Sequence, residues 1–555
     1  MRAPPPLPIL ASLLYAAGMA AACVEPPSDA TARVDEIFAR WDSSASPGCA
    51  LSVSQAGTPL LSRAWGMADL EHDIPNTPST IFEGGSLAKQ FTSAAVVLLA
   101  LDGKLSLDDD VRTYIPEVRD YRTPVTLRRL MTHTSGMRDW GSVASISGWG
   151  RGERSHRHAH VLDIVSRQSA LNFEPGHEYS YSNTGYNLLA VVVDRVSGMP
   201  FAQFSRERIF EPLGMSDTQW RDDYRRLVPR RSTAYSASDD DGFLINRPIE
   251  YVHGNGGILS TVGDLQTWNA ALTDGRLGGE EFVRMMHDRA VLNDGRTISY
   301  AGGLQLRDFA GVPSITHTGS TAGYRGFIGR YPDQQLSVAI LCNVGNANPG
   351  ALGGQVARVF LGDAASPDPE PGEGMVLAEE ELTAKAGLYR EVDTGDPLRV
   401  TLEDGALRVG NQRLVAHSAS EFQVGATERR LVFGAPTDGG RAAIDEYTGE
   451  YYDNTYEPVD EFAPTAGQLG AYVGTFHSDD AETTLVVAVE GDQLVAKRRP
   501  DAVFELEPVY RDAFNAGGLG RIRFDLGADG RATAFGIRQG RVYDMRFQRV
   551  ADSGE

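Results

Sequence analysis

With 555 residues, the chain is long enough for about three domains and a large hydrophobic core. Its formal net charge of −22 argues against nucleic acid and anionic lipid as binding partners. A charge balance of this kind is typical of a soluble surface and does not identify a substrate.

The first residues predict an export signal. Arg2 precedes an apolar run at 7–15, which is too short to span a membrane as a helix, and small residues follow it. We therefore expect residues 1–22 to be a signal peptide and the protein to be exported to the periplasm or the outer surface. Ala-Ala-Ala-Cys at 20–23 also resembles a bacterial lipoprotein cleavage box. In that case Cys23 would be the lipidated first residue and a membrane anchor, whereas it has no such role under ordinary secretion.

A helix and a hairpin are expected next. Apolar residues recur at helical spacing within 31–44. Two strand-like segments, 48–54 and 59–66, follow and are joined by a short turn, which predicts a β-hairpin.

The stretch 83–101 contains the strongest chemical signal. Ser86 and Lys89 stand three residues apart at the start of a long apolar segment, which predicts a buried helix closed by Gly103. One helical turn brings the hydroxyl and the amine to the same side. Only four of the 52 basic residues are lysines, and an arginine could not give up its proton to act as a base. We therefore interpret Ser86 as a nucleophile activated by Lys89.

A loop at 173–186 carries the second group of interest. Tyr181 and Asn183 flank a single residue ahead of a predicted helix. A phenol near a cationic amine could have its pKa lowered enough to act as a general base. The neighbouring amide could hold a substrate carbonyl and fix the lysine through hydrogen bonds. Taken alone, a loop tyrosine that caps a helix is the alternative.

Strand-like segments return after a mainly helical region at 86–288; they lie at 300–306, 314–318, 323–331 and 336–343. We expect one antiparallel sheet that the hairpin strands open and the last three of these segments close. The helical region is then an insertion between the two halves of the sheet. The predicted fold class is α+β, with helices packed on an antiparallel sheet.

One of these strands carries the third group, His317-Thr318-Gly319-Ser320. A glycine in a strand allows a substrate backbone to approach closely. The backbone N–H of Ser320 could form an oxyanion hole with that of Ser86. A structural role is the alternative for His317.

The C-terminal part predicts two small β domains. Residues 363–378 are rich in proline, glycine and acidic residues and predict an extended linker after a first domain at 24–362. Beyond the linker, a pattern of short strands repeats at an offset of 87 residues, which carries Gly387 onto Gly474. We expect two small antiparallel β-barrels, at 379–462 and 463–555.

The three motifs, in this order and spacing, resemble those of the serine β-lactamases of class C and of the related penicillin-binding DD-peptidases and esterases. The segments 126–137, 210–215 and 256–261 are also similar to segments of that family, and the resemblance covers residues 30–362. It implies an acyl-enzyme mechanism without a metal or an organic cofactor. The catalytic residues that it implies are Ser86, Lys89, Tyr181 and His317. The substrate-binding residues are Asn183, Thr318, Gly319 and Ser320.

One departure from the family pattern bears on the substrate. The β-lactamases usually have Lys-Thr-Gly where this chain has His317-Thr318-Gly319. A histidine there resembles the D-aminopeptidase branch, which also carries two small β-barrels after the catalytic domain. The resemblance therefore favours a D-amino-acid peptidase or amidase, with a small-molecule or peptide substrate such as a peptidoglycan fragment. A carboxyl-ester hydrolase or lactonase, a β-lactamase, and a non-catalytic peptidoglycan-binding protein are the alternatives.

Two further expectations come from the same resemblance. It places the first strand of the sheet beside the last, which makes Cys49 and Cys342 neighbours; we expect two buried thiols in preference to a disulfide. The D-aminopeptidase branch restricts the substrate amine with a loop of its last barrel. We accordingly expect the second barrel to wall the cleft, through carboxylates of the loop 477–482 or through the turn 499–501.

Three further features of the sequence are weaker signals of function. Arg325 could clamp a substrate carboxylate, with an ordinary surface arginine as the alternative. His156, His158 and His160 alternate as metal ligands on a strand can, but a solvated loop is expected. The glycine-rich stretch 254–257 lacks a preceding strand and a phosphate-facing helix, so a nucleotide-binding loop is not expected.

Overall fold

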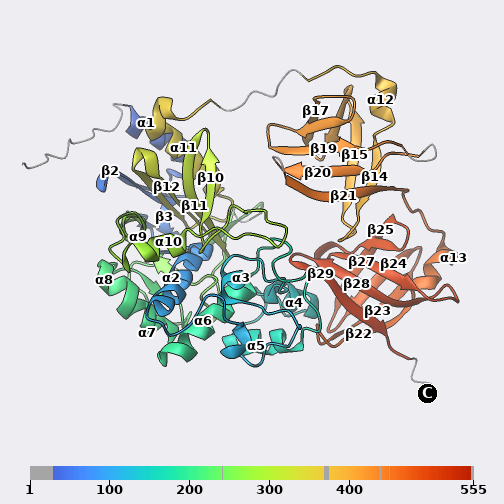
Figure 1. The fold of residues 1–555 in the computed structure, drawn as a ribbon, viewed down its shortest axis with the longest axis horizontal. Helices are drawn as coiled ribbons and strands as arrows, with labels where there is room; N and C mark the ends of the chain where they lie inside the picture. Colours follow the sequence, from blue (N-terminus) through green and yellow to red (C-terminus); the bar gives the residue numbers. More distant parts are fainter. Residues whose placement is uncertain (1–28, 241, 368–373, 437–439, 449–450, 552–555) are drawn as a thin grey trace, which may run out of the picture.

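The computed structural model describes residues 29–240, 242–367, 374–436, 440–448 and 451–551. The predicted signal peptide and Cys23 lie outside the described residues, as do residues 368–373 of the predicted linker. An α+β domain lies on one side of the molecule and two β-barrels lie on the other (Figure 1). No helix in the described part of the chain has the length and apolarity that crossing a bilayer requires.

One antiparallel sheet forms the centre of the α+β domain, with the strand order β10-β11-β12-β13-β1-β2. Its strands are β1 (Cys49–Gln55), β2 (Thr58–Trp65), β10 (Gln305–Phe309), β11 (Val312–Thr321), β12 (Tyr324–Tyr331) and β13 (Leu336–Cys342). The hairpin β1–β2 and the pairing of the first strand with the last are both confirmed. The expected number of closing strands was wrong: four strands close the sheet, because β10 pairs with β11 as an additional edge strand.

Helices cover both faces of this sheet, which explains why β1 is apolar at successive positions and not only at alternate ones. Leu51 and Val53 point to the face covered by α1 (Ala30–Phe38) and α11 (Pro349–Leu361). Ala50 points to the opposite face, which α9 (Val262–Asp274) covers. Strands that are buried on both sides read as continuous apolar runs.

The helical insertion surrounds α2 (Ala88–Leu101), which is buried from Ala88 to Leu99, as its apolar composition predicts. The helix predicted at 31–44 is shorter, because α1 ends at Phe38 and a 3-10 turn, Ala39–Trp41, follows it. The other helices of the insertion are α3 (Leu127–Met131), α4 (Trp140–Ser147), α5 (His158–Arg167), α6 (Asn183–Ser197), α7 (Phe201–Ser205), α8 (Glu211–Leu213) and α10 (Gly279–Met286). Its short strands are β3 (Met67–Asp69), β4 (Ile74–Pro75), β5 (Phe82–Glu83), β6 (Gln219–Trp220), β7 (Tyr235–Ser238), β8 (Gly242–Ile245) and β9 (Ile258–Ser260).

A disulfide joins the first and last strands of the sheet. Cys49 and Cys342 stand directly opposite each other in β1 and β13, with their Cα atoms 4.0 Å apart. The prediction that they are neighbours is confirmed, and the preference for two free thiols was wrong. Directly opposite residues of an antiparallel pair come within about 4.5 Å at the closer type of position, and this brings the two sulfur atoms within bonding reach.

We expect the purified protein to yield one disulfide-linked peptide pair that contains Cys49 and Cys342 when it is digested without reduction. The bridge closes a loop across a sequence separation of 293 residues. Replacing both cysteines by alanine should therefore lower stability by about 2–4 kcal/mol, measured as unfolding by denaturant. Free thiols at both positions in protein that was never exposed to reductant would contradict the assignment.

The two predicted barrels are present, and each closes on itself with eight strands. The strands of the first are β14 (Gly387–Glu391), β15 (Pro397–Glu403), β16 (Ala406–Val409), β17 (Gln412–Ala416), β18 (Glu421–Val424), β19 (Arg429–Phe433), β20 (Ile444–Thr448) and β21 (Tyr451–Val459). Those of the second are β22 (Gly474–Ser478), β23 (Thr483–Glu490), β24 (Gln493–Arg498), β25 (Ala502–Tyr510), β26 (Ala513–Asn515), β27 (Arg521–Leu526), β28 (Ala532–Gln539) and β29 (Val542–Arg549). The short helices α12 (Glu379–Thr383) and α13 (Ala466–Leu469) precede the two barrels.

The second barrel is docked on the helical insertion next to α4 (Figure 1). Arg138 and Asp480 form an ion pair of 2.8 Å across the boundary, and their side chains are only 3% and 12% exposed. The amide and the hydroxyl of Ser169 also donate to the Asp480 carboxylate. Apolar residues of the barrel and of the insertion belong to one continuous hydrophobic cluster. The barrel is thus fixed to the surface beside the loop that carries Tyr181.

Candidate active site

Ser86 lies on a single 3-10 turn, Gly85–Leu87, directly before α2. Gly85 has a φ of +53°, and a Cβ atom there would lie 2.7 Å from the backbone nitrogen of Ser320. Both the left-handed conformation and the close approach require glycine. This turn therefore brings the Ser86 segment against β11.

Gly319, in β11, allows the same close approach between this strand and the turn that carries Ser86. A Cβ atom at Gly319 would lie 1.9 Å from the carbonyl oxygen of Gly84. The expected reason for this glycine, space for a substrate backbone, was therefore wrong: the missing side chain makes room for the turn that carries Ser86.

The Lys89 amine is fully buried and touches three oxygen atoms. Its Nζ lies 2.7 Å from the carbonyl oxygen of Asn255, 3.0 Å from Oδ1 of Asn183 and 3.2 Å from Oγ of Ser86. Burial, together with the positive charge of Arg541, holds the pKa of Lys89 well below its usual value. The amine is therefore the kind of lysine that can be neutral and act as a base.

The hydrogen bonds of a neutral amine determine where its lone pair points. Such an amine has two N–H donors and one lone pair. The Asn255 carbonyl and Asn183 Oδ1 can only accept, so they take the two N–H groups. The lone pair is left for the hydroxyl of Ser86, as activation of the nucleophile requires.

Tyr181 lies at the same place, but its chemistry differs from the expectation. Burial raises the pKa of its phenol well above the usual value, and the hydrogen bond from Ser86 and the charge of Arg541 offset this only in part. The Lys89 amine lies over the ring, 4.7 Å from its centroid. The prediction of a lowered pKa was therefore wrong, and the phenol is a proton donor at neutral pH.

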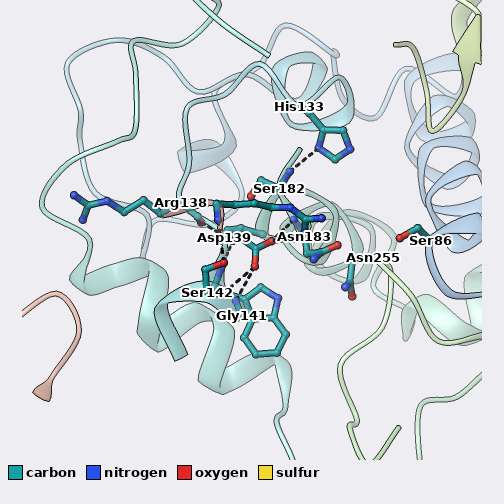
Figure 2. Close-up of polar contacts among 12 residues, drawn as sticks. Ser86, His133, Arg138, Asp139, Gly141, Ser142, Ser182, Asn183 and Asn255 are labelled. Carbon is teal, nitrogen blue, oxygen red and sulfur yellow. Dashed lines mark hydrogen bonds and ion pairs between the residues drawn. The ribbon is translucent and has the colours of Figure 1, made fainter. Parts of the chain in front are cut away.

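A buried carboxylate supports Asn183 from behind (Figure 2). Asp139 accepts hydrogen bonds from the backbone nitrogens of Gly141 (3.0 Å), Ser142 (3.2 Å) and Asn183 (2.7 Å). It thus caps the N-terminus of α4 and fixes the first residue of α6 at once. An aspartate before a helix is visible in the sequence, but its link to Asn183 is not.

His133 was not predicted to have a role of its own. Its Nδ1 accepts a hydrogen bond of 3.1 Å from the backbone nitrogen of Ser182 (Figure 2). Its ring packs on those of Tyr181 and Tyr300, with centroids 4.1 and 4.7 Å apart. His133 therefore positions the Tyr181 ring and the backbone next to it.

His317 faces the same site from β11 with both ring nitrogens engaged. Nε2 lies 2.9 Å from Oη of Tyr300, and Nδ1 lies 2.6 Å from the carbonyl oxygen of Thr318. Burial and the charge of Lys89 lower the pKa of His317 to about 4. The ring is neutral at pH 7, so it supplies no positive charge where a lysine stands in the related β-lactamases.

These groups line a cleft of about 450 Å³. Its wall comprises Gly85, Ser86, Arg151, Tyr181, Asn183, Asn255, Gly256, Gln305, His317, Thr318, Ser320, Thr321 and Arg541. The structure thus brings the three motifs together, and all their predicted site residues line the cleft except Lys89 and Gly319, which lie behind the wall. Arg151, Asn255, Gln305, Thr321 and Arg541 were not predicted. Gly254 turns the Asn255 carbonyl toward Lys89 with a φ of +98°, so the stretch 254–257 contributes to this site.

Two weaker expectations were wrong. Arg325 is absent from the wall of the cleft, because its guanidinium turns back to the carbonyl oxygens of Ala322 and Tyr324. His156 does not lie in a solvated loop: it is buried and its Nε2 bonds to the Trp149 carbonyl. His158 begins α5 and bonds to the backbone of His253. The described residues contain no group of three or more side chains placed to hold a metal ion.

The second barrel does form part of the cleft wall, but through another segment than expected. Arg541, in the turn between β28 and β29, lines the cleft, whereas no residue of 477–482 or 499–501 does so. The Asp480 side chain is instead used to dock the barrel. A cation therefore occupies the place where carboxylates were expected.

The fold and the Ser–Lys pair define a serine hydrolase. The chain belongs to the Beta-lactamase family, whose model matches residues 34–359.

Individual proteins are similar to this chain, and one of them is similar beyond this domain. The chain is 27% identical to a D-aminopeptidase of Gluconobacter oxydans over 80% of this chain and 82% of the relative. It is 30% identical to penicillin-binding protein 4* of Bacillus subtilis over 52% of this chain and 67% of the relative. The fold is similar to that of a D-amino acid amidase from Ochrobactrum anthropi, with a TM-score of 0.52, 23% identity and coverage of 61% of this chain and 100% of that one.

We expect kcat/KM to fall as the pH is lowered through the pKa of Lys89, because only the neutral amine can accept a proton. Arg541 contributes to lowering that pKa, so Arg541→Gln should raise it and move the acidic limb of the pH profile to higher pH. The profile is measured with a neutral nitrophenyl ester. Arg531→Gln removes an exposed charge at the far end of β28 and should leave the limb in place. A shift to lower pH in the Arg541 variant would contradict the assignment.

Proposed function

We propose that the protein is an exported acyl-enzyme hydrolase that cleaves amide bonds of D-amino-acid peptides or amides. The observation that carries the proposal is the buried Lys89 amine, whose lone pair is left for the Ser86 hydroxyl. A serine that is merely structural has no need of a desolvated lysine beside it.

In the first half of the reaction, Ser86 Oγ attacks the amide carbon while Lys89 takes the hydroxyl proton. The backbone N–H groups of Ser86 and Ser320 stabilise the oxyanion that forms. The protonated phenol of Tyr181 gives its proton to the leaving nitrogen as the C–N bond breaks, and Lys89 then returns the proton to the phenol oxygen. In the second half, water attacks the Ser86 ester by the same route in reverse and releases the acid.

The preference for D-amino acids is supported by relatives. The D-aminopeptidase similarity extends over 80% of this chain, which is more than the α+β domain alone contains. The similarity therefore also includes part of the region that the two barrels occupy.

Export is supported by two features. Residues 1–22 have the pattern of a signal peptide, and Cys49 and Cys342 form the type of bond that persists in oxidising compartments. We propose a periplasmic or outer-surface location, with Cys23 as a lipid anchor if the lipoprotein signal is used.

The test has two parts, made with the full-length mature protein. D-alanine amide and L-alanine amide are compared as a matched pair, and we expect hydrolysis of the D-enantiomer to be faster by at least about 100-fold, as hydrogen-bonded sites can achieve. A fluorophosphonate should label the protein at Ser86, and Ser86→Ala should lose the label. Labelling at Ser86 with equal rates for both enantiomers would reject the D-preference, and the absence of labelling would reject the mechanism.

A further inference from the structure

The charges that line the cleft are all of one sign. Arg151 and Arg541 are the only guanidinium groups in its wall, and no aspartate or glutamate of the described residues belongs to that wall. The side chains are 34% and 42% exposed, so solvent and ligands reach both. From this we infer that the cleft binds a substrate carboxylate against Arg541 and Arg151, and that the enzyme selects acidic D-amino-acid peptides over amides whose only charge is a free amine. The inference rests on the proposed function and names the substrate class of that same site.

Arg541 is held in a fixed position at the cleft. Its backbone nitrogen lies 3.2 Å from Oγ of Ser142, and its carbonyl oxygen accepts a hydrogen bond of 3.0 Å from Asn172. Its guanidinium stacks on the ring of Tyr181, 4.6 Å from the centroid. A guanidinium that is positioned in this way loses little conformational entropy when it binds a carboxylate.

The carboxylates that pair with these arginines lie behind the wall. Asp139 is 3.5 Å from Arg541 and only 4% exposed, and its oxygens already accept three backbone N–H groups. Glu250 is 3% exposed and holds Arg151 through bonds of 2.6 and 2.8 Å. Both carboxylates are therefore inaccessible to a substrate amine, whereas the guanidinium groups face the cleft.

Other ionisable groups near the cleft add no negative charge to its wall. The His317 ring is neutral, and its ring nitrogens bond within the protein. The Tyr181 phenol keeps its proton. The Asp479 and Glu482 side chains of the loop 477–482 are 100% and 72% exposed and are not part of the wall. The described part of the wall thus holds no anionic partner for a protonated amine.

The experiment uses two pairs of substrates that differ only in a carboxylate. In the first pair, N-acetyl-D-alanyl-D-alanine is compared with its C-terminal carboxamide, which places the charge on the leaving group. In the second, N-succinyl-D-alanine nitroanilide is compared with its N-succinamoyl analogue, in which a carboxamide replaces the carboxylate, so that the charge lies on the acyl side. In at least one pair, we expect kcat/KM to be higher for the acid by about 10- to 100-fold, since hydrogen bonds to charged groups are worth this factor. The pair that responds shows on which side of the scissile bond the carboxylate binds.

Two variants test whether the second barrel sets the acid-to-neutral ratio, which is kcat/KM for the acid divided by kcat/KM for its neutral partner. Arg541→Gln should reduce the acid-to-neutral ratio of the responding pair at least about fivefold, and Arg541→Lys should restore part of it because the charge returns without the fork of donors. Arg531→Gln removes an exposed charge from the same barrel and should leave the ratio unchanged. Because the ratio compares two substrates of one enzyme, a general loss of activity cancels. In the wild-type enzyme, raising the salt from about 0.05 M to about 0.5 M should also lower the ratio.

The outcomes separate the two proposals. Equal rates for both members of each pair, or faster hydrolysis of D-alanine nitroanilide with its free amine than of the acidic substrates, would overturn the carboxylate site and leave the hydrolase intact. An unchanged ratio in Arg541→Gln would overturn the role of the second barrel. If no substrate is cleaved and Ser86 is not labelled by a fluorophosphonate, the proposed function itself fails.

Discussion

Replacing Lys89 by arginine is expected to lower kcat by about 10²–10⁴-fold, the loss that follows removal of a general base. Arginine keeps a positive charge at this position but cannot offer the lone pair that faces Ser86 Oγ at 3.2 Å. Ser86→Ala should abolish turnover altogether. The measurement is steady-state kinetics with a nitrophenyl ester and with D-alanine amide.

Lys104→Arg is the matched control, because Lys104 lies exposed just beyond the end of the same helix and should tolerate the change. Circular dichroism of the Lys89 variant checks that the fold is retained. A folded Lys89→Arg enzyme that keeps more than about a tenth of the wild-type rate would reject lysine as the base.

The second large effect is expected at Glu83, three residues before the nucleophile. Its carboxylate is fully buried and bonds to Arg221 at 2.9 and 3.1 Å and to Arg231 at 3.3 Å. Glu83→Gln leaves two arginines without their counter-charge, and the Arg221 side chain is only 1% exposed. Removing one member of a buried ion pair costs about 3–5 kcal/mol, so we expect a loss of that size in denaturant unfolding.

Glu281 provides the comparison for this variant. It pairs with Arg284 on the surface of α10, with both side chains more than half exposed. Because exposed ion pairs contribute little, Glu281→Gln should unfold at the same denaturant concentration as the wild type. Equal stability of the Glu83 and Glu281 variants would show that solvent or another group compensates the two arginines.

Features that follow from local spacing or from the order of motifs could be predicted from the sequence. The Ser86–Lys89 pair could be predicted because three residues make nearly one helical turn, so the spacing alone places both groups on one side. The repeat at 87 residues likewise predicted two barrels, since equal spacing of apolar residues and turns implies equal strands. The order Ser86, Tyr181, His317 indicated the family and with it the pairing of the first and last strands.

Properties that depend on the surroundings of a side chain were predicted less well. The proximity of Tyr181 to Lys89 suggested a lowered phenol pKa, but full burial decides the direction and raises it. Adjacency of Cys49 and Cys342 followed from strand order, whereas bond formation depended on their standing directly opposite in the register. Desolvation and register are set by atoms far along the chain, which local patterns do not contain.

The sequence by itself determined the α+β domain, the two barrels and the groups that react, because each follows from local spacing or from ordered motifs. Only the tertiary structure decided that the turn of the second barrel places Arg541 in the cleft, with Asp139 behind it. That contact depends on how a barrel docks through scattered polar groups such as Arg138 and Asp480, which have no periodicity in the sequence. The pairing of the nucleophile with its lysine is therefore encoded locally, and the charge of the pocket is encoded in the packing of two domains.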